Sequence, residues 1–146
     1  MLIRNLIGGD LFESLQSNPE MFSEKCAIKI MSHILSAIAY MHNKKICHRD
    51  IKPENLLFEQ EDKQVLKLID FGISIPFKIG NYMNELVGTA YYMSPELINR
   101  KYNEKCDIWA AGIILFLLMT GKTLYTGSCD EDIMQNIKNN PKKFKG

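Results

Sequence analysis

The segment from Cys47 to Leu57 constrains the fold most, because it places a dense polar turn directly before an apolar run. Six polar or charged residues lie between His48 and Asn55, and three apolar residues, 56–58, follow at once. A solvated loop rarely ends in such a run, so we expect this loop to be held against a core. Pro53 fixes its own φ and biases the residue before it toward an extended conformation, which excludes a continuous helix here.

A second acidic turn, Asp70-Phe71-Gly72, follows a short apolar stretch. Residues 56–58 and 65–69 predict two short strands joined by a polar turn. Such a hairpin would set the two acidic turns side by side and bring Asp50 and Asn55 near Asp70. These oxygen donors suit Mg²⁺, which binds one or two carboxylates together with substrate phosphates. The two turns therefore predict a site for phosphoryl transfer and not a cysteine or zinc site.

Composition sets broad limits on the function. The chain has 146 residues, enough for one domain, and 46% are hydrophobic, so a core is available. A net charge of +1 gives no electrostatic argument for nucleic acid or an anionic membrane as partner. The cysteines show no C-x-x-C spacing, which predicts reduced thiols and a cytoplasmic location. The longest apolar stretch, 108–119, is too short to span a bilayer and predicts a buried helix.

Helical periodicity marks further elements. Ser23 is placed to cap a long helix, along which apolar residues recur at three- and four-residue steps. This stripe consists of Ala27, Ile30, Ile34, Ile38 and Met41. Residues 107–120 predict the buried helix, and residues 130–139 predict an amphipathic one. His33 and His42 have no partner at ligand spacing, so surface or helix-end roles are expected for both.

Three motifs occur in the order and spacing of the protein kinase signature set, which the chain therefore resembles. They are His48-Arg49-Asp50 with Asn55 five residues after the aspartate, Asp70-Phe71-Gly72, and Ser94-Pro95-Glu96. Lys52, two residues after Asp50, is typical of the serine/threonine type. Residues 8–13, 88–96 and 104–115 are most similar to calcium-dependent protein kinases and their calmodulin-dependent relatives.

The resemblance implies an α+β, mainly α fold, the helical C-terminal lobe of a protein kinase, with a short β-hairpin carrying the catalytic and metal-binding turns. Residues 1–146 would be a partial kinase domain, with the hinge at about 1–9 and the catalytic lobe at 10–146. The sequence has no G-x-G-x-x-G loop and no lysine of the V-A-I-K type, so we expect the N-terminal lobe to precede it. We also expect the last helices of the C-terminal lobe to follow it. We then expect this segment alone to be inactive. A calcium-sensing module elsewhere in the parent chain is implied by resemblance alone, because no D-x-D-x-D-G loop is present.

Catalytic roles follow from the resemblance, with ATP and Mg²⁺ as cofactors. Asp50 would accept the proton of a substrate serine or threonine hydroxyl, and Lys52 would steady the γ-phosphate. Asn55 and Asp70 would hold Mg²⁺, and Thr89 would bridge Asp50 and Lys52 and help exclude tyrosine. The alternative, in which the two aspartates only cap turns, does not explain both motifs together.

Nucleotide and peptide contacts are also implied. The carbonyl of Arg4 and the N–H of Leu6 would face the adenine edge, with Ile3 at the gatekeeper position. Apolar side chains would lie under the adenine: Leu57, Ile114 and Leu118. Core packing explains the last two equally well. Asp10 and Glu54 match positions that bind an arginine three residues before the phosphoacceptor, so protein substrates with a basic context are expected.

Supporting contacts complete the expectations. Asp107 would accept hydrogen bonds from the backbone around His48, and the His48 ring would stack on Phe71. Arg49 would face the activation segment, where Glu85 could supply a fixed negative charge; the alternative for Glu85 is a solvated loop charge. A different class of function also stays open, namely a non-catalytic binding or regulatory piece of a kinase, or a pseudokinase.

Overall fold

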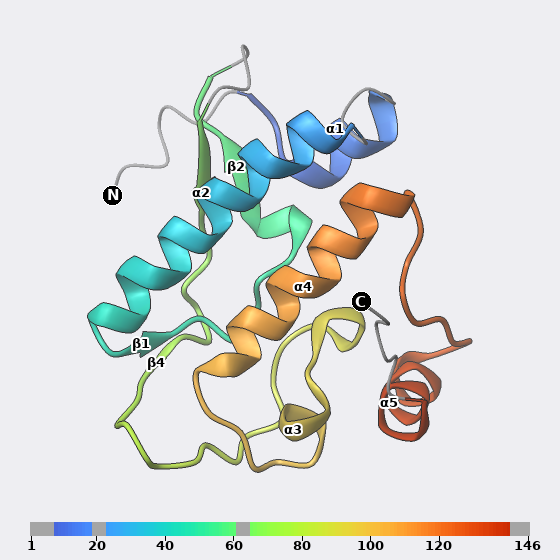
Figure 1. The fold of residues 1–146 in the computed structure, drawn as a ribbon. Helices are drawn as coiled ribbons and strands as arrows, with labels where there is room; N and C mark the ends of the chain where they lie inside the picture. Colours follow the sequence, from blue (N-terminus) through green and yellow to red (C-terminus); the bar gives the residue numbers. More distant parts are fainter. Residues whose placement is uncertain (1–7, 19–22, 61–64, 141–146) are drawn as a thin grey trace.

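The computed structural model describes residues 8–18, 23–60 and 65–140, and this part of the chain is mostly helical with a few short strands (Figure 1). In chain order the elements are α1 (Leu11–Ser17), α2 (Glu24–Asn43), β1 (Ile46–Cys47), the 3-10 turn η2 (Pro53–Asn55), β2 (Leu56–Phe58), β3 (Leu66–Leu68), β4 (Ile75–Pro76), the 3-10 turn η3 (Ala90–Tyr92), α3 (Pro95–Ile98), α4 (Lys105–Thr120) and α5 (Asp130–Asn139). The mainly helical character expected from the sequence is confirmed.

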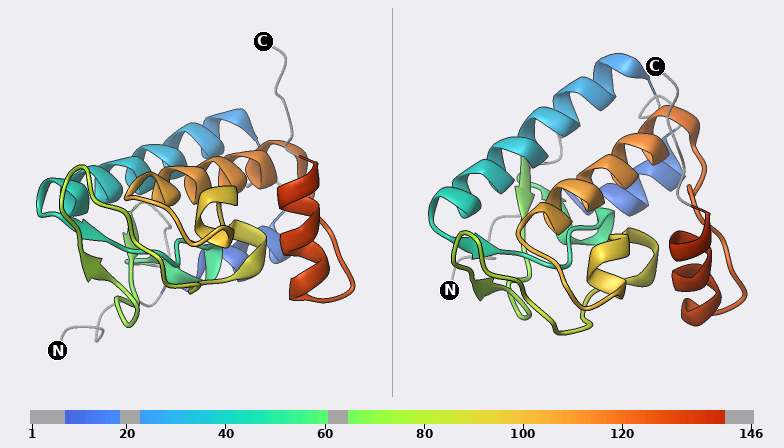
Figure 2. Two further views of the ribbon diagram at one scale, coloured as in Figure 1. Left: turned by 90° about the horizontal axis from the view of Figure 1, so that it is seen from below. Right: turned by 60° about the horizontal axis from the view of Figure 1, so that its bottom comes forward.

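Helices α2 and α4 lie side by side and form the centre of the main core (Figures 1 and 2). The Ser23 hydroxyl accepts a hydrogen bond from the Cys26 N–H at 3.4 Å, so the predicted cap of α2 is confirmed. Helix α4 is apolar on all sides, but the predicted buried helix is buried only in part. Ile114 and Leu118 are fully buried, whereas Ile108, Leu115 and Met119 are exposed. The helix ends at Gly121, whose φ of 67° lies in the left-handed region that glycine adopts without steric cost.

The hairpin predicted between the two acidic turns is present as the antiparallel pair β2–β3. Leu56 lies opposite Leu68, and Phe58 lies opposite Leu66. Beyond the strands, the Ile69 N–H donates to the Asn55 carbonyl at 2.9 Å. This bond extends the pairing up to the point where both polar turns begin.

A second pair of strands was not predicted. Strand β1 pairs with β4 in antiparallel fashion, with Cys47 opposite Ile75. Two-residue strands are too short to show an alternating pattern, so the sequence gives no signal for them. Farther along the segment 73–87, Met83 pairs with Tyr102 through two backbone hydrogen bonds of 2.7 and 3.2 Å. The long segment without periodicity is therefore fastened to the rest of the fold at two places.

The C-terminal part of the described chain forms a second hydrophobic cluster. Helix α5 packs against η3 and α3 and contributes Ile133 and Ile137, which are buried. The boundaries predicted for α5 are confirmed. Among the helices of residues 8–18, 23–60 and 65–140, none combines the length and apolar character needed to cross a membrane.

Candidate active site

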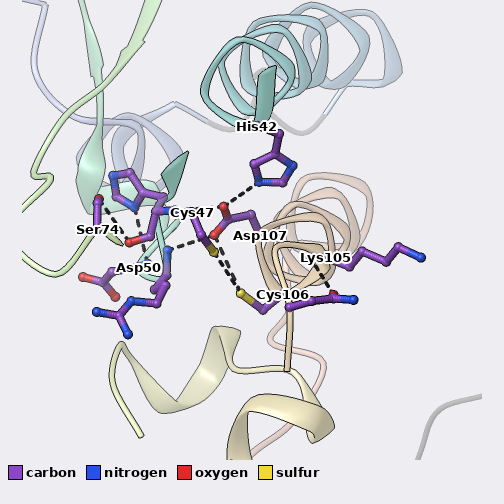
Figure 3. A network of polar contacts seen from close by, with 10 residues as sticks. His42, Cys47, Asp50, Ser74, Lys105, Cys106 and Asp107 are labelled. Carbon is purple, nitrogen blue, oxygen red and sulfur yellow. Dashed lines mark hydrogen bonds and ion pairs between the residues drawn. The ribbon is translucent and has the colours of Figure 1, made fainter. Parts of the chain in front are cut away.

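The loop that follows β1 is fixed to α4 by one buried carboxylate (Figure 3). Asp107 Oδ2 accepts from the His48 N–H, and Oδ1 accepts from the Arg49 N–H, each at 2.9 Å. Asp107 is only 1% exposed, so these bonds are shielded from competing water. The predicted anchoring role of Asp107 is confirmed.

His42 also contacts this carboxylate, with Nε2 2.8 Å from Asp107 Oδ2. The sequence predicted that His42 would be a surface or helix-end residue, and it did not predict the contact with Asp107. The two residues are 65 positions apart, and no local pattern could connect them. His42 lies in the last turn of α2, so the aspartate joins α2, α4 and the loop at one point.

The backbone takes an unusual shape in both acidic turns. Arg49 has φ of 71° and Asp70 has φ of 63°, which is the left-handed region. A side chain in this conformation costs about 1–2 kcal/mol. Such costs concentrate at functional sites, where surrounding contacts hold the backbone in place. At Arg49 the bond from its own N–H to Asp107 supplies such a contact.

Asp50, Lys52 and Thr89 form a closed polar triangle. The Thr89 hydroxyl donates to Asp50 Oδ1 at 2.8 Å, and the Lys52 ammonium donates to Thr89 Oγ1 at 2.9 Å. Lys52 Nζ also lies 3.1 Å from Asp50 Oδ2. Asn55 Nδ2 donates to the Asp50 carbonyl at 2.8 Å and to Oδ2 at 3.2 Å. The predicted bridging contact of Thr89 is confirmed, and three residues, Lys52, Asn55 and Thr89, together orient the Asp50 carboxylate.

The His48 ring connects the two acidic turns. It is fully buried, and Nε2 lies 3.1 Å from the Ile69 carbonyl, while Nδ1 accepts from the Asp50 N–H at 3.3 Å. This arrangement suits a neutral ring with the proton on Nε2. Burial lowers the pKa of His48, which favours the same neutral form. The prediction that the hairpin brings the two turns together is confirmed.

Phe71 contacts the same ring edge-on, with ring centroids 5.0 Å apart. The predicted stacking of these two aromatic side chains is therefore confirmed. Phe71 is nevertheless 50% exposed, so its contact with His48 buries only part of the Phe71 side chain.

The oxygen donors predicted to bind a metal fit Mg²⁺. Asn55 directs its nitrogen to Asp50, so the other atom of the amide group, Oδ1, is left for a cation. Asp70 is exposed, and its Oδ1 accepts from the Gly72 N–H at 3.1 Å. One carboxylate and one amide oxygen are hard ligands, which suit Mg²⁺ better than a thiophilic metal.

Arg49 reaches from this site to the segment that follows. Its Nε donates to the Ile73 carbonyl at 2.7 Å, and its Nη1 donates to Glu85 at 2.5 Å and to the Tyr102 hydroxyl at 3.2 Å. The Arg49 side chain is 3% exposed, whereas that of Glu85 is 61% exposed. The predicted proximity of Glu85 is confirmed. Tyr102 was not predicted, since it lies 53 positions from Arg49 in sequence.

The remaining predicted contacts lie around this centre. Asp10 Oδ1 accepts from the Glu13 N–H at 2.7 Å and caps α1. Glu54 is exposed on η2, against which α1 packs. Leu57 is half-buried and pairs with Asp10 in an isolated bridge.

Two groups of predictions have a different outcome. Ile114 and Leu118 are both 0% exposed and belong to the main core, which agrees with the core-packing alternative and excludes direct contact with adenine. The predicted hinge contacts lie outside the described residues: Ile3, Arg4 and Leu6.

Three features of the site characterise the class of protein. They are the polar triangle of Asp50, Lys52 and Thr89, the His48 ring between the two acidic turns, and the buried Asp107 carboxylate of α4. The chain matches the protein kinase domain over residues 1–145, and it belongs to that family.

Within the family it is similar to calcium-dependent protein kinases. It is 41% identical over 133 residues to calcium-dependent protein kinase 4 of Plasmodium berghei (strain Anka), covering 90% of this chain and 25% of that protein. The protein of the same name from Plasmodium falciparum (isolate 3D7) is 42% identical over 133 residues, with 90% and 25% covered. Calcium-dependent protein kinase 21 of Oryza sativa subsp. japonica is 41% identical over 131 residues, with 89% and 23% covered. The chain thus spans about a quarter of the length of these relatives.

Proposed function

We propose that the chain is the C-terminal lobe of a serine/threonine protein kinase, with the hinge at about 1–9 and the catalytic lobe at 10–146. The observation that carries this proposal is the triangle of Asp50, Lys52 and Thr89, with contacts of 2.8, 2.9 and 3.1 Å. A turn cap needs no lysine and no hydroxyl from a segment 39 residues away. A carboxylate that must accept and release a proton beside the transferred phosphate needs both the lysine and the hydroxyl as partners.

The reaction follows from the placement of these groups. The oxygen of a substrate serine or threonine attacks the γ-phosphorus of ATP, the bond to the β–γ bridging oxygen breaks, and ADP leaves. Asp50 accepts the proton of the attacking hydroxyl, a contribution of about 10²–10⁴-fold in rate. Lys52 neutralises charge on the γ-phosphate, and positioning supplies most of the remaining rate enhancement. Mg²⁺ held by Asn55 and Asp70 would neutralise charge on the phosphates.

Substrate preference follows from charge and space. Asp10 and Glu54 lie on adjoining elements, α1 and η2, and would pair with an arginine three residues before the phosphoacceptor. Thr89 lies beside Asp50 and would favour serine and threonine over the longer tyrosine side chain. The relatives' names support calcium control of the parent protein. Free cysteines at all four positions support a cytoplasmic location.

Regulation follows from the contact between Arg49 and Glu85. A guanidinium that is 3% exposed requires anionic or carbonyl partners, and Glu85 supplies the negative charge that a loop phosphate would otherwise supply. The parent enzyme would then be active without phosphorylation of this segment.

The test is a phosphorylation assay of the full-length parent protein on an array of peptides. Wild-type protein is expected to prefer serine or threonine with an arginine three residues earlier, and Asp50→Asn is expected to lose about 10²–10⁴-fold in kcat. Equal activity of Asp50→Asn would overturn the catalytic assignment. An array without arginine preference would overturn only the peptide contacts.

A further inference from the structure

Two buried sulfur atoms lie in contact where the catalytic loop meets α4. Cys47 Sγ is 3.5 Å from Cys106 Sγ, although the residues are 59 positions apart (Figure 3). Cys47 directly precedes His48, and Cys106 directly precedes Asp107. The two thiols therefore lie beside the carboxylate that holds the loop. Their spacing in the sequence gave no sign of this contact.

Cys106 borders a cavity, whereas Cys47 lies deeper in the fold. Cys106 lines a cavity of about 660 Å³ together with Glu96, Tyr102 and Trp109, and 6% of its surface is exposed. Cys47 is 0% exposed and lies behind it. A small polar molecule entering the cavity meets Cys106 first.

The surroundings of Cys47 differ from those of Cys106. The hydrogen bond to Cys106 and burial raise the pKa of the Cys47 thiol, so Cys47 keeps its proton. Cys106 lies in the first turn of the sixteen-residue helix α4, and its Sγ is 4.0 Å from Asp107 Oδ1.

We propose that Cys106 and Cys47 form an oxidation site for hydrogen peroxide or a comparably small hydroperoxide. The Cys106 sulfur attacks one peroxide oxygen, the O–O bond breaks, the Cys106 thiol proton passes to the leaving oxygen, and a sulfenic acid and water form. The Cys47 thiol then attacks the sulfenic sulfur, a disulfide forms, and water leaves. In balance, two thiols and one hydrogen peroxide give one disulfide and two waters.

The disulfide would change the surroundings of Asp107. The two sulfur atoms must approach from 3.5 Å to about 2.05 Å. Each cysteine is bonded directly to a residue of the Asp107–His48 contact, so the loop and the helix end must adjust together. The product is a covalent link between the loop that carries Asp50 and the helix that anchors it.

The test uses the 146-residue chain with Cys26→Ser and Cys129→Ser, which leaves only the proposed pair. After hydrogen peroxide treatment we expect both free thiols to disappear and the mass to fall by about 2 Da, with both changes reversed by dithiothreitol. Digestion without reductant should give one cross-linked peptide containing Cys47 and Cys106.

A further Cys47→Ser variant separates the two roles. Without its partner, Cys106 should accumulate as a sulfenic acid that dimedone traps, and no cross-link should form. Circular dichroism checks that this variant folds. If it does not, the peptide map of the peroxide-treated wild-type chain decides by itself. Recovery of both thiols unmodified in the doubly substituted chain would overturn the proposal, as would, in the peroxide-treated wild-type chain, oxidation of the exposed Cys129 with Cys47 and Cys106 unmodified.

Discussion

Replacing Asp107 by asparagine tests whether this carboxylate holds the catalytic loop in place. Each carboxylate oxygen accepts one backbone N–H at 2.9 Å, from His48 and from Arg49. In Asp107→Asn one oxygen becomes an NH₂ group, which cannot accept from an N–H. One buried donor is therefore left unpaired, and the other loses a charged acceptor.

The expected cost follows from these two losses. A hydrogen bond to a charged group contributes about 1.5–3 kcal/mol, and an unpaired buried donor costs about 1–3 kcal/mol. Together they predict that Asp107→Asn lowers the free energy of unfolding by about 2.5–6 kcal/mol. Small domains have about 5–15 kcal/mol in total, so this is a large part of the stability.

Urea unfolding of the 146-residue chain measures this change. With a slope of about 2 kcal/mol/M, the midpoint should fall by about 2 M. Hydrogen exchange at the amides of His48 and Arg49 should accelerate more than at α5. As a control, His42→Ala removes the contact to Asp107 and the edge-on ring contact to Phe77 of a side chain that is 18% exposed, and about 1 kcal/mol is expected. A midpoint for Asp107→Asn within about 0.5 kcal/mol of wild type would refute the reasoning.

Three further predictions concern the residues around this anchor. Gly88→Ala should destabilise the chain by more than about 2 kcal/mol in urea unfolding, because its φ is +105° and its Cβ would lie 2.5 Å from the Arg49 carbonyl oxygen. Glu85→Gln in the full-length enzyme should lower kcat about fivefold, or about 1 kcal/mol, because a charged partner of Arg49 is lost. For His48, burial lowers the pKa from its ordinary 6.5, so below about pH 6.5 the unfolded state takes up a proton that the folded state does not. The free energy of unfolding should therefore keep the whole His48 contribution above about pH 6.5, and it should decrease as the pH falls from about 6.5 to 5.

Matched controls exist for these three changes. Gly80→Ala shares a positive φ, +86°, but its Cβ would meet nothing within 4 Å, so it isolates the conformational cost from the collision. Equal losses for Gly80→Ala and Gly88→Ala would contradict the close approach. Full kcat of Glu85→Gln without loop phosphate would rule out the fixed-charge role. The pH effect should diminish in His48→Phe, and an unchanged pH profile would exclude His48 as its source.

The sequence by itself predicted the elements whose signals lie within a few residues. The stripe along α2, the cap at Ser23 and the bounds of α5 follow from helical periodicity and terminal residues. The two acidic turns and the hairpin between them follow from the order in which polar turns and short apolar runs succeed each other along the chain. The contact of Thr89 with Asp50 could be predicted only because the motif resembles a known family.

Only the tertiary structure decided which distant side chains meet. Tyr102 reaches Arg49 across 53 positions, His42 reaches Asp107 across 65, and Cys47 reaches Cys106 across 59. None of these residues carries a local pattern, because a side chain's partner depends on how whole elements pack. Helix α4 buries part of its apolar surface against α2, and its Asp107 carboxylate holds the catalytic loop. This packing brings these residues together.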